Sequence, residues 1–598
     1  MFFTFLFIIG TLILNTLSED IVKPNIVFIV ADDLGWDDVS IHGSDQIMTP
    51  NIDIMGYEGT ILHQYYTDSL GTASRSALFT GKYAIRLGTH GSSIAATEDG
   101  GVPLSERLLP SYLQDAGYTT HLLGKWQLGH SRKSYLPTSR GFDTFYGFVT
   151  GSVDYYTYSH VESFNGSAFF GLDLFENTHP VDNQTGHLTD IITDQAIQII
   201  RNHDINKPLY LHVCHAAPHA GGGLVHLQTP EDTINANDHI AHSARRLYAG
   251  MVTGLDRSIG NIIAALAERE ILDNTLIIFV SDNGAAPVGA TQNFGSNLPL
   301  RGTKGRPWEG AIRSIAIVWH ASITPQIWNG LFHVTDWLPT LVAAAGGKAP
   351  TGIDGVNQWN ALTKDEDSSR KRLLLTVDDL NGWAAYRDGD FKIIIGDVDK
   401  ETSVYLGNEF KELRLPVHLY ESTLLSSEAA HVFKEILDLY LDLDEIFHKR
   451  DKLSLRSKHN ISQEFNFCVP TRESGCLFNI TADPLETTNL WSSLPDVVRR
   501  MVLRLRYYWA QINPRCLVKI DKKSDPSLRD FVWSPWLEDN EQVAKPIRDR
   551  PRFPLKVLVG ELQYLIDSKF NNFSETMSAY VKSMADSFLE NVSELFSF

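Results

Sequence analysis

The sequence predicts an α/β protein with a large, mostly parallel mixed sheet flanked by helices, followed by a smaller C-terminal β-rich α+β domain. Three observations lead to this fold class. Several apolar, β-rich runs end abruptly in polar residues. In the segments between these runs, apolar residues recur at helical spacing, and the sequence pattern changes near residue 346.

The first apolar run, residues 25–30, reads Asn-Ile-Val-Phe-Ile-Val. A continuous run of this kind suits a strand of a parallel sheet that is covered on both faces. Residues 118–123, 208–214 and 276–280 are predicted to form further strands of the same sheet.

Polar or ionisable residues follow each of these strands. Asp32 and Asp33 follow the first strand, and Asp282 and Asn283 follow the last. Carboxylates at the end of a buried strand are costly unless a cation or hydrogen-bond donors satisfy them, and open α/β sheets bind ligands at this end. In a mostly parallel sheet the four side chains converge on one ion, and their oxygen atoms favour Ca²⁺ or Mg²⁺. The alternative is a solvated Asp-Asp turn that caps a helix.

Helices are predicted over residues 103–116, 187–202 and 244–268. In the third segment apolar residues recur at helical spacing, at Tyr248, Met251, Val252, Leu255, Ile259, Ile262, Ile263 and Leu266. We interpret these positions as core faces without a functional role.

The chain divides into four predicted parts: a signal peptide at 1–18, a main domain at 24–345, a smaller domain at 346–540 and a tail at 541–598. Within the smaller domain, residues 385–395 predict a hairpin, and a small antiparallel sheet with a packing helix is expected near 370–535. The charged run 436–460 is expected to be an exposed helix or an insertion.

The tail has apolar residues at helical spacing, at Phe573, Met577, Tyr580, Val581, Met584, Phe588 and Val592. It is predicted to be an amphipathic helix that packs on its own domain. A homo-oligomer contact is the alternative, and a membrane-surface contact is disfavoured because the polar face lacks basic residues.

Composition limits the partners. The 598 residues carry a formal net charge of −20, which argues against general nucleic-acid or anionic-membrane binding. Residues 2–14 are apolar, too short to span a bilayer and followed by polar residues, which is typical of a secretory signal peptide. No later segment predicts a transmembrane anchor.

Two further features bear on the secretory route, to the lysosome or the extracellular space. Six sequons predict glycan sites at Asn165, Asn183, Asn460, Asn479, Asn572 and Asn591. Cys214 is predicted to be a buried free thiol, and one disulfide is expected among Cys468, Cys476 and Cys516. No Cys/His cluster has zinc-binding spacing.

Residues 66–83 resemble the signature of the sulfatase family, in which Cys-x-Pro-Ser-Arg is followed by Thr-Gly-Arg/Lys-Tyr. The matching residues are Ser74, Arg75, Thr80, Gly81 and Tyr83. Further matching stretches lie at 24–36, 106–120, 122–129, 137–144, 281–284, 299–304, 308–310 and 336–341. The resemblance covers most of 24–345 and is strongest to the arylsulfatase B group with its arylsulfatase I and J relatives.

The resemblance implies an alkaline-phosphatase-like fold and a role for each matching site residue. Asp32, Asp33, Asp282 and Asn283 would bind Ca²⁺. Arg75 and Lys125 would hold the nucleophile region and the sulfate oxygens. His219 and Lys304 would face the ester oxygen, with His215 as the alternative to His219. Taken without the family, Lys304 would be expected to be a solvated loop lysine.

Three positions depart from the family pattern. Gly71 stands where the family has the Cys that is oxidised to formylglycine, so that this nucleophile cannot form. Ala73 replaces the neighbouring Pro. Gln127 replaces the His expected to act as the base that regenerates the aldehyde. Loss of a nucleophile in a covalent mechanism costs on the order of 10⁶ in rate.

The sequence therefore predicts a pseudosulfatase that keeps the metal and a pocket for a sulfated glycan or sulfate ester. One alternative is an active sulfuric ester hydrolase with another nucleophile, for which Ser69, Thr72 or a metal-bound water would be required. The other is a secreted structural or interaction protein that works through its tail.

Overall fold

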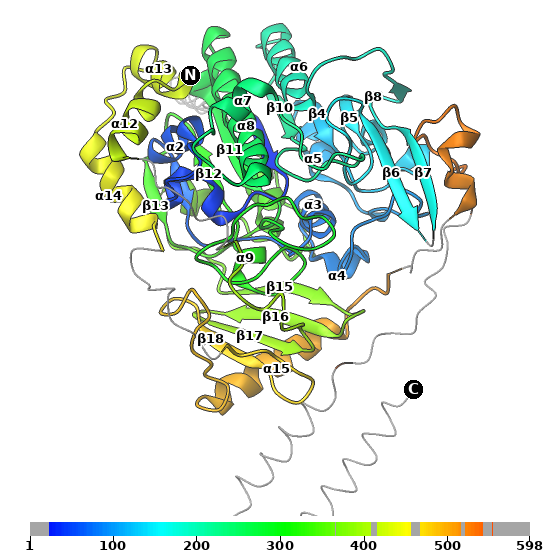
Figure 1. The fold of residues 1–598 in the computed structure, drawn as a ribbon, viewed down its shortest axis with the longest axis vertical. Helices are drawn as coiled ribbons and strands as arrows, with labels where there is room; N and C mark the ends of the chain where they lie inside the picture. The colour runs from blue at the N-terminus through cyan, green and yellow to red at the C-terminus, as the bar shows by residue number, and fades with distance from the viewer. Residues whose placement is uncertain are drawn as a thin grey trace, which may run out of the picture.

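A computed structural model describes residues 23–164, 166–364, 366–407, 416–455, 467–515, 521–541 and 553. A mixed ten-stranded sheet forms its centre (Figure 1). The strand order is β13 (Gln326–Trp328), β2 (Thr60–Leu62), β12 (Ala316–Trp319), β11 (Thr275–Ser281), β1 (Asn25–Ala31), β10 (Leu209–Cys214), β4 (Thr119–Lys125), β5 (Thr144–Phe148), β8 (Phe175–Glu176) and β9 (His179–Pro180).

The middle of the sheet is parallel, as predicted. Strands β11, β1, β10, β4 and β5 all run in one direction, whereas β12 and β8 are antiparallel to their neighbours. Along β1, Val27 and Ile29 face one hydrophobic core, and Ile26, Phe28 and Val30 face the other. Burial on both faces explains why the strand reads as an unbroken apolar run.

Helices cover both faces of this sheet. One core is closed by α2 (Pro50–Tyr57), α6 (Leu188–Asn202) and α8 (Ser243–Glu268), beside which α7 (Glu231–Asn235) packs. The other is closed by α3 (Gly71–Thr80), α5 (Leu109–Asp115), α10 (Trp337–Ala344) and α11 (Trp359–Thr363). The helices predicted at 187–202 and 244–268 are confirmed. The one predicted at 103–116 begins only at Leu109, because Pro110 occupies its first turn, where proline favours a helix start.

The smaller sheet is antiparallel and contains β15 (Arg372–Asp378), β16 (Trp383–Asp388), β17 (Phe391–Gly396) and β18 (Cys476–Asn479). The hairpin predicted at 385–395 is formed by β16 and β17. Helix α15 (Pro495–Trp509) packs on one face, and the other face contacts Trp308 and Tyr66 of the larger part. Figure 1 shows this sheet and α15 below the large sheet.

Three helices from the second half of the chain pack on the large core: α12 (Val417–Leu425), α13 (Glu428–Glu435) and α14 (Leu443–Leu453). Phe433 stacks on Trp319 of β12 with ring centroids 5.1 Å apart. The described part of the charged run 436–460 thus includes α14, which buries Ile446 and Leu453. The boundary predicted near residue 346 stays a prediction.

Shorter elements complete the architecture. They include α4 (Ala84–Leu87), α9 (Glu309–Ile312), the pair β3 (Tyr65–Tyr66) and β14 (Phe332–His333), and the hairpin β6 (Ser159–Phe164) and β7 (Ser167–Leu172). The segment 521–541 lies beside β7, where Leu172 N donates to Phe531 O at 2.7 Å (Figure 1).

The disulfide prediction is confirmed, because Cys468 and Cys476 are bonded, and Cys214 is a buried free thiol as predicted. Of the sequon residues, Asn183 is exposed and Asn479 is half-buried. Cys516, the other four sequon residues, the predicted signal peptide and the predicted tail helix lie outside the described residues. Within the described ranges, no helix is long and apolar enough to cross a membrane.

Candidate functional site

The four oxygen-bearing side chains predicted to converge do so at the carboxyl ends of β1 and β11. These two strands are parallel neighbours with Ala31 opposite Ser281, so the residues that follow them lie together. Asp33 N donates to Asp282 Oδ1 at 3.2 Å, and Asn283 Nδ2 donates to Asp33 Oδ1 at 2.7 Å. All four residues are buried.

Arg75, on helix α3, joins the two strand ends. Its Nη2 lies 2.9 Å from Asp282 Oδ2 and 3.5 Å from Asp32 Oδ1, and its Nε donates to the same Asp282 oxygen at 3.1 Å. Its third nitrogen, Nη1, contacts the thiol of Cys214 at 3.2 Å. Arg75 is therefore a buried positive charge that pairs with both carboxylates and holds them together.

Two lysines reach the same carboxylates from other elements. Lys125, the last residue of β4, places Nζ 2.6 Å from Asp32 Oδ2, and Lys304 places Nζ 2.6 Å from Asp33 Oδ2. The expectation of a solvated loop lysine is wrong for Lys304, because its side chain is only 11% exposed. Its position is set by the carboxylate rather than by the loop sequence.

His219 joins this cluster and His215 does not. His219 Nε2 lies 3.6 Å from Asp33 Oδ2, while its Nδ1 is 2.6 Å from Ala220 O. His215 Nε2 instead faces Ser258 Oγ on α8 at 3.0 Å. Of the two histidines weighed from the sequence, the structure places His219 at the site.

The charges of the cluster balance. Asp32, Asp33 and Asp282 face Arg75, Lys125 and Lys304, three acids against three bases. Burial raises the pKa of Asp32, but Lys125, His219 and Arg75 outweigh this and hold it below its usual value. Burial lowers the pKa of Lys125 and of His219 from their usual values, although the nearby carboxylates oppose this effect.

The donor set fits a hard cation. Asp32 Oδ1 and Asn283 Oδ1 are buried and accept no hydrogen bond from the described residues, so both oxygens are available as ligands. Ligand atoms of Asp32, Asp33 and His219 lie within 4.8 Å of one another. Carboxylate and amide oxygens at this density are typical of calcium and magnesium sites.

Gly71, the first residue of α3, faces these ligands. A Cβ atom built on it would lie 2.6 Å from Asp282 Oδ2 and 3.6 Å from Asn283 Oδ1. The first helical hydrogen bond runs from Ser74 N to Leu70 O at 3.0 Å, so the N–H groups of 71–73 precede the helical ladder. N–H groups at the start of a helix favour the binding of an anion next to them. A side chain at position 71 would therefore reach into the centre of the cluster.

A cavity of about 390 Å³ opens onto this cluster and brings together five predicted residues, Gly71, Lys125, Gln127, His219 and Lys304. Gln127 has a positive φ of 56°, and its buried Oε1 has no hydrogen-bond partner within the described part of the chain. Lys125 pairs with Asp32 and Lys304 with Asp33, and Gly71 faces Asp282. The lining is thus in contact with the predicted residues that do not line the cavity themselves: Asp32, Asp33, Asp282, Asn283 and Arg75.

The remaining lining was missed by the sequence reasoning. His160 and Glu162 come from β6, and the rest of the wall consists of Leu70, Ser93, Ile94, Ala95, Gly151, Ser152 and Thr291. Leu70 lies within the signature at 66–83, and no motif surrounds the other positions. Only the strand-like pattern of 159–172 could have indicated a hairpin, and nothing in it shows that the hairpin borders the cavity.

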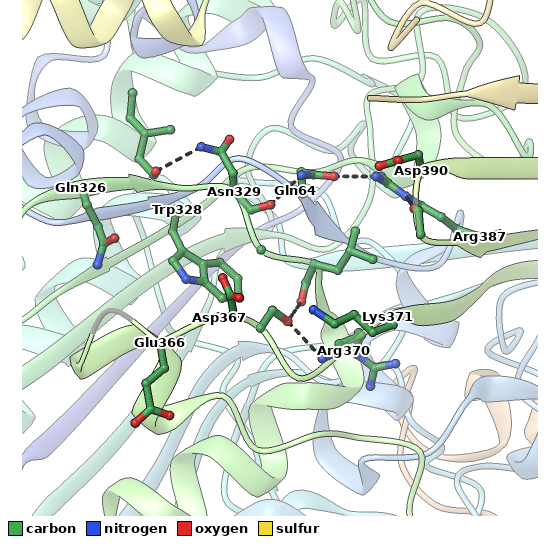
Figure 2. A pocket seen from close by; sticks show the side chains of 15 residues that line it. Gln64, Gln326, Trp328, Asn329, Glu366, Asp367, Arg370, Lys371, Arg387 and Asp390 are labelled. Atoms are coloured by element: carbon green, nitrogen blue, oxygen red, sulfur yellow. Dashed lines mark hydrogen bonds between the residues drawn. The ribbon is translucent and has the colours of Figure 1, made fainter. Parts of the chain in front are cut away.

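A second cavity, of about 430 Å³, lies where β13 meets the loops around the small sheet (Figure 2). Arg387 Nη2 donates to Gln64 Oε1 at 2.6 Å, and Gln64 Nε2 donates to Asn329 O at 2.6 Å. Two of its polar side chains, Arg387 and Gln64, thus bond to each other, and none of the predicted site residues lines it. We therefore place the candidate site in the first cavity.

The sequence model of the sulfatase family, described as "Sulfatase", matches residues 24–347, more than half of the chain. The chain belongs to this family, as its motifs predicted, and its large mixed sheet with a separate small antiparallel sheet is the fold of the solved sulfatases it resembles. It is related to the arylsulfatases.

Among curated relatives, arylsulfatase J of Mus musculus is 34% identical over 530 residues, which cover 88% of this chain and 82% of the relative. N-acetylgalactosamine-6-sulfatase of Homo sapiens is 32% identical over 352 residues, 56% of this chain and 65% of the relative. The crystal structure of Ps i-CgsB is similar with a TM-score of 0.62 at 25% identity, covering 82% of this chain and 94% of that one. The same protein has been solved in complex with k-i-k-neocarrahexaose.

Proposed function

We propose that this protein is a secretory-pathway pseudosulfatase, which binds the sulfate group of a sulfated glycan at a metal site and does not hydrolyse it by the formylglycine route. The observation that carries the proposal is Gly71. It faces Asp282 and Asn283, where the nucleophile of a sulfatase would stand, and it has no side chain to oxidise.

Neither Ser69 nor Thr72, the hydroxyl-bearing residues near Gly71 in the sequence, is placed to stand in for the missing group. Ser69 Oγ lies 3.0 Å from Thr376 Oγ1, and Thr72 Oγ1 accepts a hydrogen bond from Ile94 N at 3.3 Å. Both residues are buried, and neither lines the cavity. Each would need a different loop path to reach a bound ester.

The charges of the cluster support the proposal that the site still binds a sulfate group. The three carboxylates and three bases of the cluster cancel, so a bound divalent cation would leave the site with two positive charges. We propose Ca²⁺, held by Asp32, Asp33, Asp282 and Asn283, with Mg²⁺ as the alternative. When bound, the ion supplies positive charge next to the sulfate oxygens.

The remaining residues take roles consistent with their positions. Lys125 lines the cavity and is proposed to hold the sulfate oxygens. The start of helix α3, which Arg75 anchors to Asp282, is proposed to hold them as well. His219 and Lys304 also line the cavity and are proposed to face the bridging ester oxygen. Gln127 has an amide where a base would be required, so it binds without transferring a proton.

A second candidate is an active sulfuric ester hydrolase. It is favoured by the two groups that would protonate a leaving alkoxide, His219 and Lys304, which remain beside the cavity. It requires a metal-bound water as the nucleophile, and a calcium-type ion acidifies water weakly compared with zinc. A function through the tail stays a prediction, because the tail helix lies outside the described residues.

The secretory assignment is part of the proposal. It is supported by the signal-peptide pattern at 1–18, by the sequons, of which Asn183 is exposed, and by the disulfide between Cys468 and Cys476. Lysosome and extracellular space are both compatible with these features.

The test compares the natural chain with a triple variant, Gly71→Cys, Ala73→Pro and Gln127→His, both expressed in cells that make formylglycine. Ala73 lies in the first turn of α3, where proline is tolerated because its N–H is outside the helical ladder. We expect the variant alone to hydrolyse an aryl sulfate. Turnover by the natural chain, abolished by Asp282→Ala, would support the hydrolase instead.

Binding is tested separately by calorimetry with sulfated glycans and inorganic sulfate in the presence of Ca²⁺. We expect saturable binding by the natural chain. No binding of any of these ligands would overturn the proposal whatever the turnover assay shows.

A further inference from the structure

One acidic side chain lines the cavity. Of its lining residues, only Glu162 carries a carboxylate, while Lys125, His160, His219 and Lys304 carry basic groups. A carboxylate in a pocket that suits an anion opposes a second negative charge, so it bears on which ligands the pocket accepts. Glu162 belongs to the β6–β7 hairpin and takes no part in the metal cluster.

Glu162 is held in one orientation by its Oε2 atom. This oxygen accepts a hydrogen bond from Ala96 N at 3.0 Å and lies 3.5 Å from His160 Nε2. The His160 ring is fixed in turn, because its Nδ1 lies 2.6 Å from Ser152 O. These contacts occupy Oε2, and no residue in the described part of the chain donates a hydrogen bond to Oε1, which is therefore available to a ligand in the cavity.

The carboxylate is ionised and partly accessible. Its side chain is 26% exposed. Burial raises the pKa of Glu162, but the nearby His160 side chain and the hydrogen bond from Ala96 N outweigh burial and hold the pKa below its usual value. An ionised carboxylate accepts hydrogen bonds and donates none, so it favours hydroxyl or amide N–H groups and opposes a second anion.

The size of the cavity limits what Glu162 can meet. At about 390 Å³ it is near the lower end of the range for small-molecule sites, which suits a sulfate group with one sugar ring. Lys125, His219 and Lys304 lie together at the metal cluster, so the sulfate belongs at that end and the ring is left to the wall that includes Glu162.

We propose that Glu162 is a specificity-determining residue: it accepts hydrogen bonds from the hydroxyl or amide groups of a monosulfated neutral sugar and excludes a ring that bears a second anionic group, such as a uronate carboxylate or another sulfate. The inference rests on the proposed function, since it requires that the cavity take a sulfate ester.

The test measures affinity by calorimetry with Ca²⁺ present, using an N-acetylhexosamine monosulfate and the corresponding disulfate. The natural chain should bind the monosulfate at least tenfold more tightly. Glu162→Gln keeps an acceptor oxygen but removes the charge, so the ratio should fall to threefold or less. Glu176→Gln, a matched change at an exposed position on β8, should keep the natural ratio.

A second variant guards against a folding defect. Glu162→Asp keeps the charge on a shorter side chain, so it should weaken monosulfate binding several-fold while still rejecting the disulfate. An unchanged ratio in folded Glu162→Gln, or equal binding of both ligands by the natural chain, would overturn the inference alone. If the natural chain bound neither sugar nor inorganic sulfate, the proposed function would fall with it.

Discussion

The Cβ position of Gly71 lies 2.6 Å from Asp282 Oδ2, closer than an unstrained contact allows. The same oxygen is held by Arg75, whose Nη2 is 2.9 Å away. The residue type at position 71 therefore affects the position of Asp282 in the ligand cluster. Any side chain placed there must move a carboxylate that an arginine anchors.

Gly71→Ala is predicted to destabilise the protein by about 1–2 kcal/mol, because the added methyl group displaces the Asp282 carboxylate. Gly254→Ala is the control, since Gly254 lies within helix α8 and its Cβ would meet nothing within 4 Å. That change should stabilise by up to about 1 kcal/mol. Thermal unfolding of the two variants gives the comparison, and equal shifts would contradict this effect of position 71.

Chelation of the metal is predicted to weaken binding of a sulfated ligand at least tenfold, because the protein charges of the cluster cancel without the ion. By linkage, the ligand should raise the affinity for Ca²⁺ by the same factor. Titrations of inorganic sulfate with EDTA, and then with added Ca²⁺, measure both effects. An affinity that does not respond to EDTA would show that the lysines alone bind the anion.

Lys392→Met is predicted to destabilise the joint between the small sheet and the large part by about 3–5 kcal/mol. Lys392 Nζ lies 3.0 Å from Glu309 Oε1 and 2.7 Å from Glu486 Oε1, and all three side chains are fully buried. Its loss leaves two carboxylates without their shared cation.

The matched control for Lys392→Met is Lys434→Met. Lys434 pairs with Glu435 at 3.3 Å, but its side chain is 67% exposed, so the change should cost less than about 1 kcal/mol. Urea unfolding followed by tryptophan fluorescence provides both free energies. Similar losses in the two variants would show that the buried cluster is not a structural joint.

The contribution of Asp256 to the free energy of unfolding is predicted to increase as the pH falls from 7 towards 4. Burial raises the pKa of Asp256 to about 7, although the backbone of Ile52 and the side chain of Asn51 donate hydrogen bonds to it. The unfolded chain releases this proton near pH 3.8 and the folded chain near pH 7. The contribution is therefore complete below pH 4 and lost as the pH rises through 7, a change of about 4 kcal/mol.

Asp256→Asn should remove this contribution and so change the slope of stability against pH, because the group no longer titrates. Free energies of unfolding at pH 4.5, 5.5, 6.5 and 7.5 measure the slope, which is informative even if the substitution lowers stability at every pH. Asp238→Asn, at an exposed position, should leave the slope unchanged. The prediction is wrong if the natural chain and Asp256→Asn have parallel curves.

The parts of the structure that could be predicted are those with a local cause. The run at 25–30 is apolar throughout because β1 contacts a core on each face, and the polar residues after β1 and β11 meet because the two strands are parallel neighbours. Lys125 and His219 also follow predicted strands, and the resemblance added their roles beside Asp32 and Asp33.

What could not be predicted depends on tertiary contacts. The sequence near 436–460 does not show that α14 packs on the large core, because only two of its residues are buried. Glu162 and His160 belong to a hairpin whose strands have no catalytic motif, and only the fold brings them to the cavity. The expectation that Lys304 would be solvated was wrong, because the carboxylate of Asp33, which follows the distant strand β1, pairs with it.

The arginine beneath the cluster has an evolutionary consequence. Arg75 ties Asp32 and Asp282 to helix α3 without any contribution from residue 71, so the architecture of the site survives the loss of its reactive atom. Under the proposed function, a change at residue 71 removes turnover while the residues that recognise the ligand keep their places. Such a copy, kept after gene duplication, would act as a receptor for the ligand that its ancestor consumed.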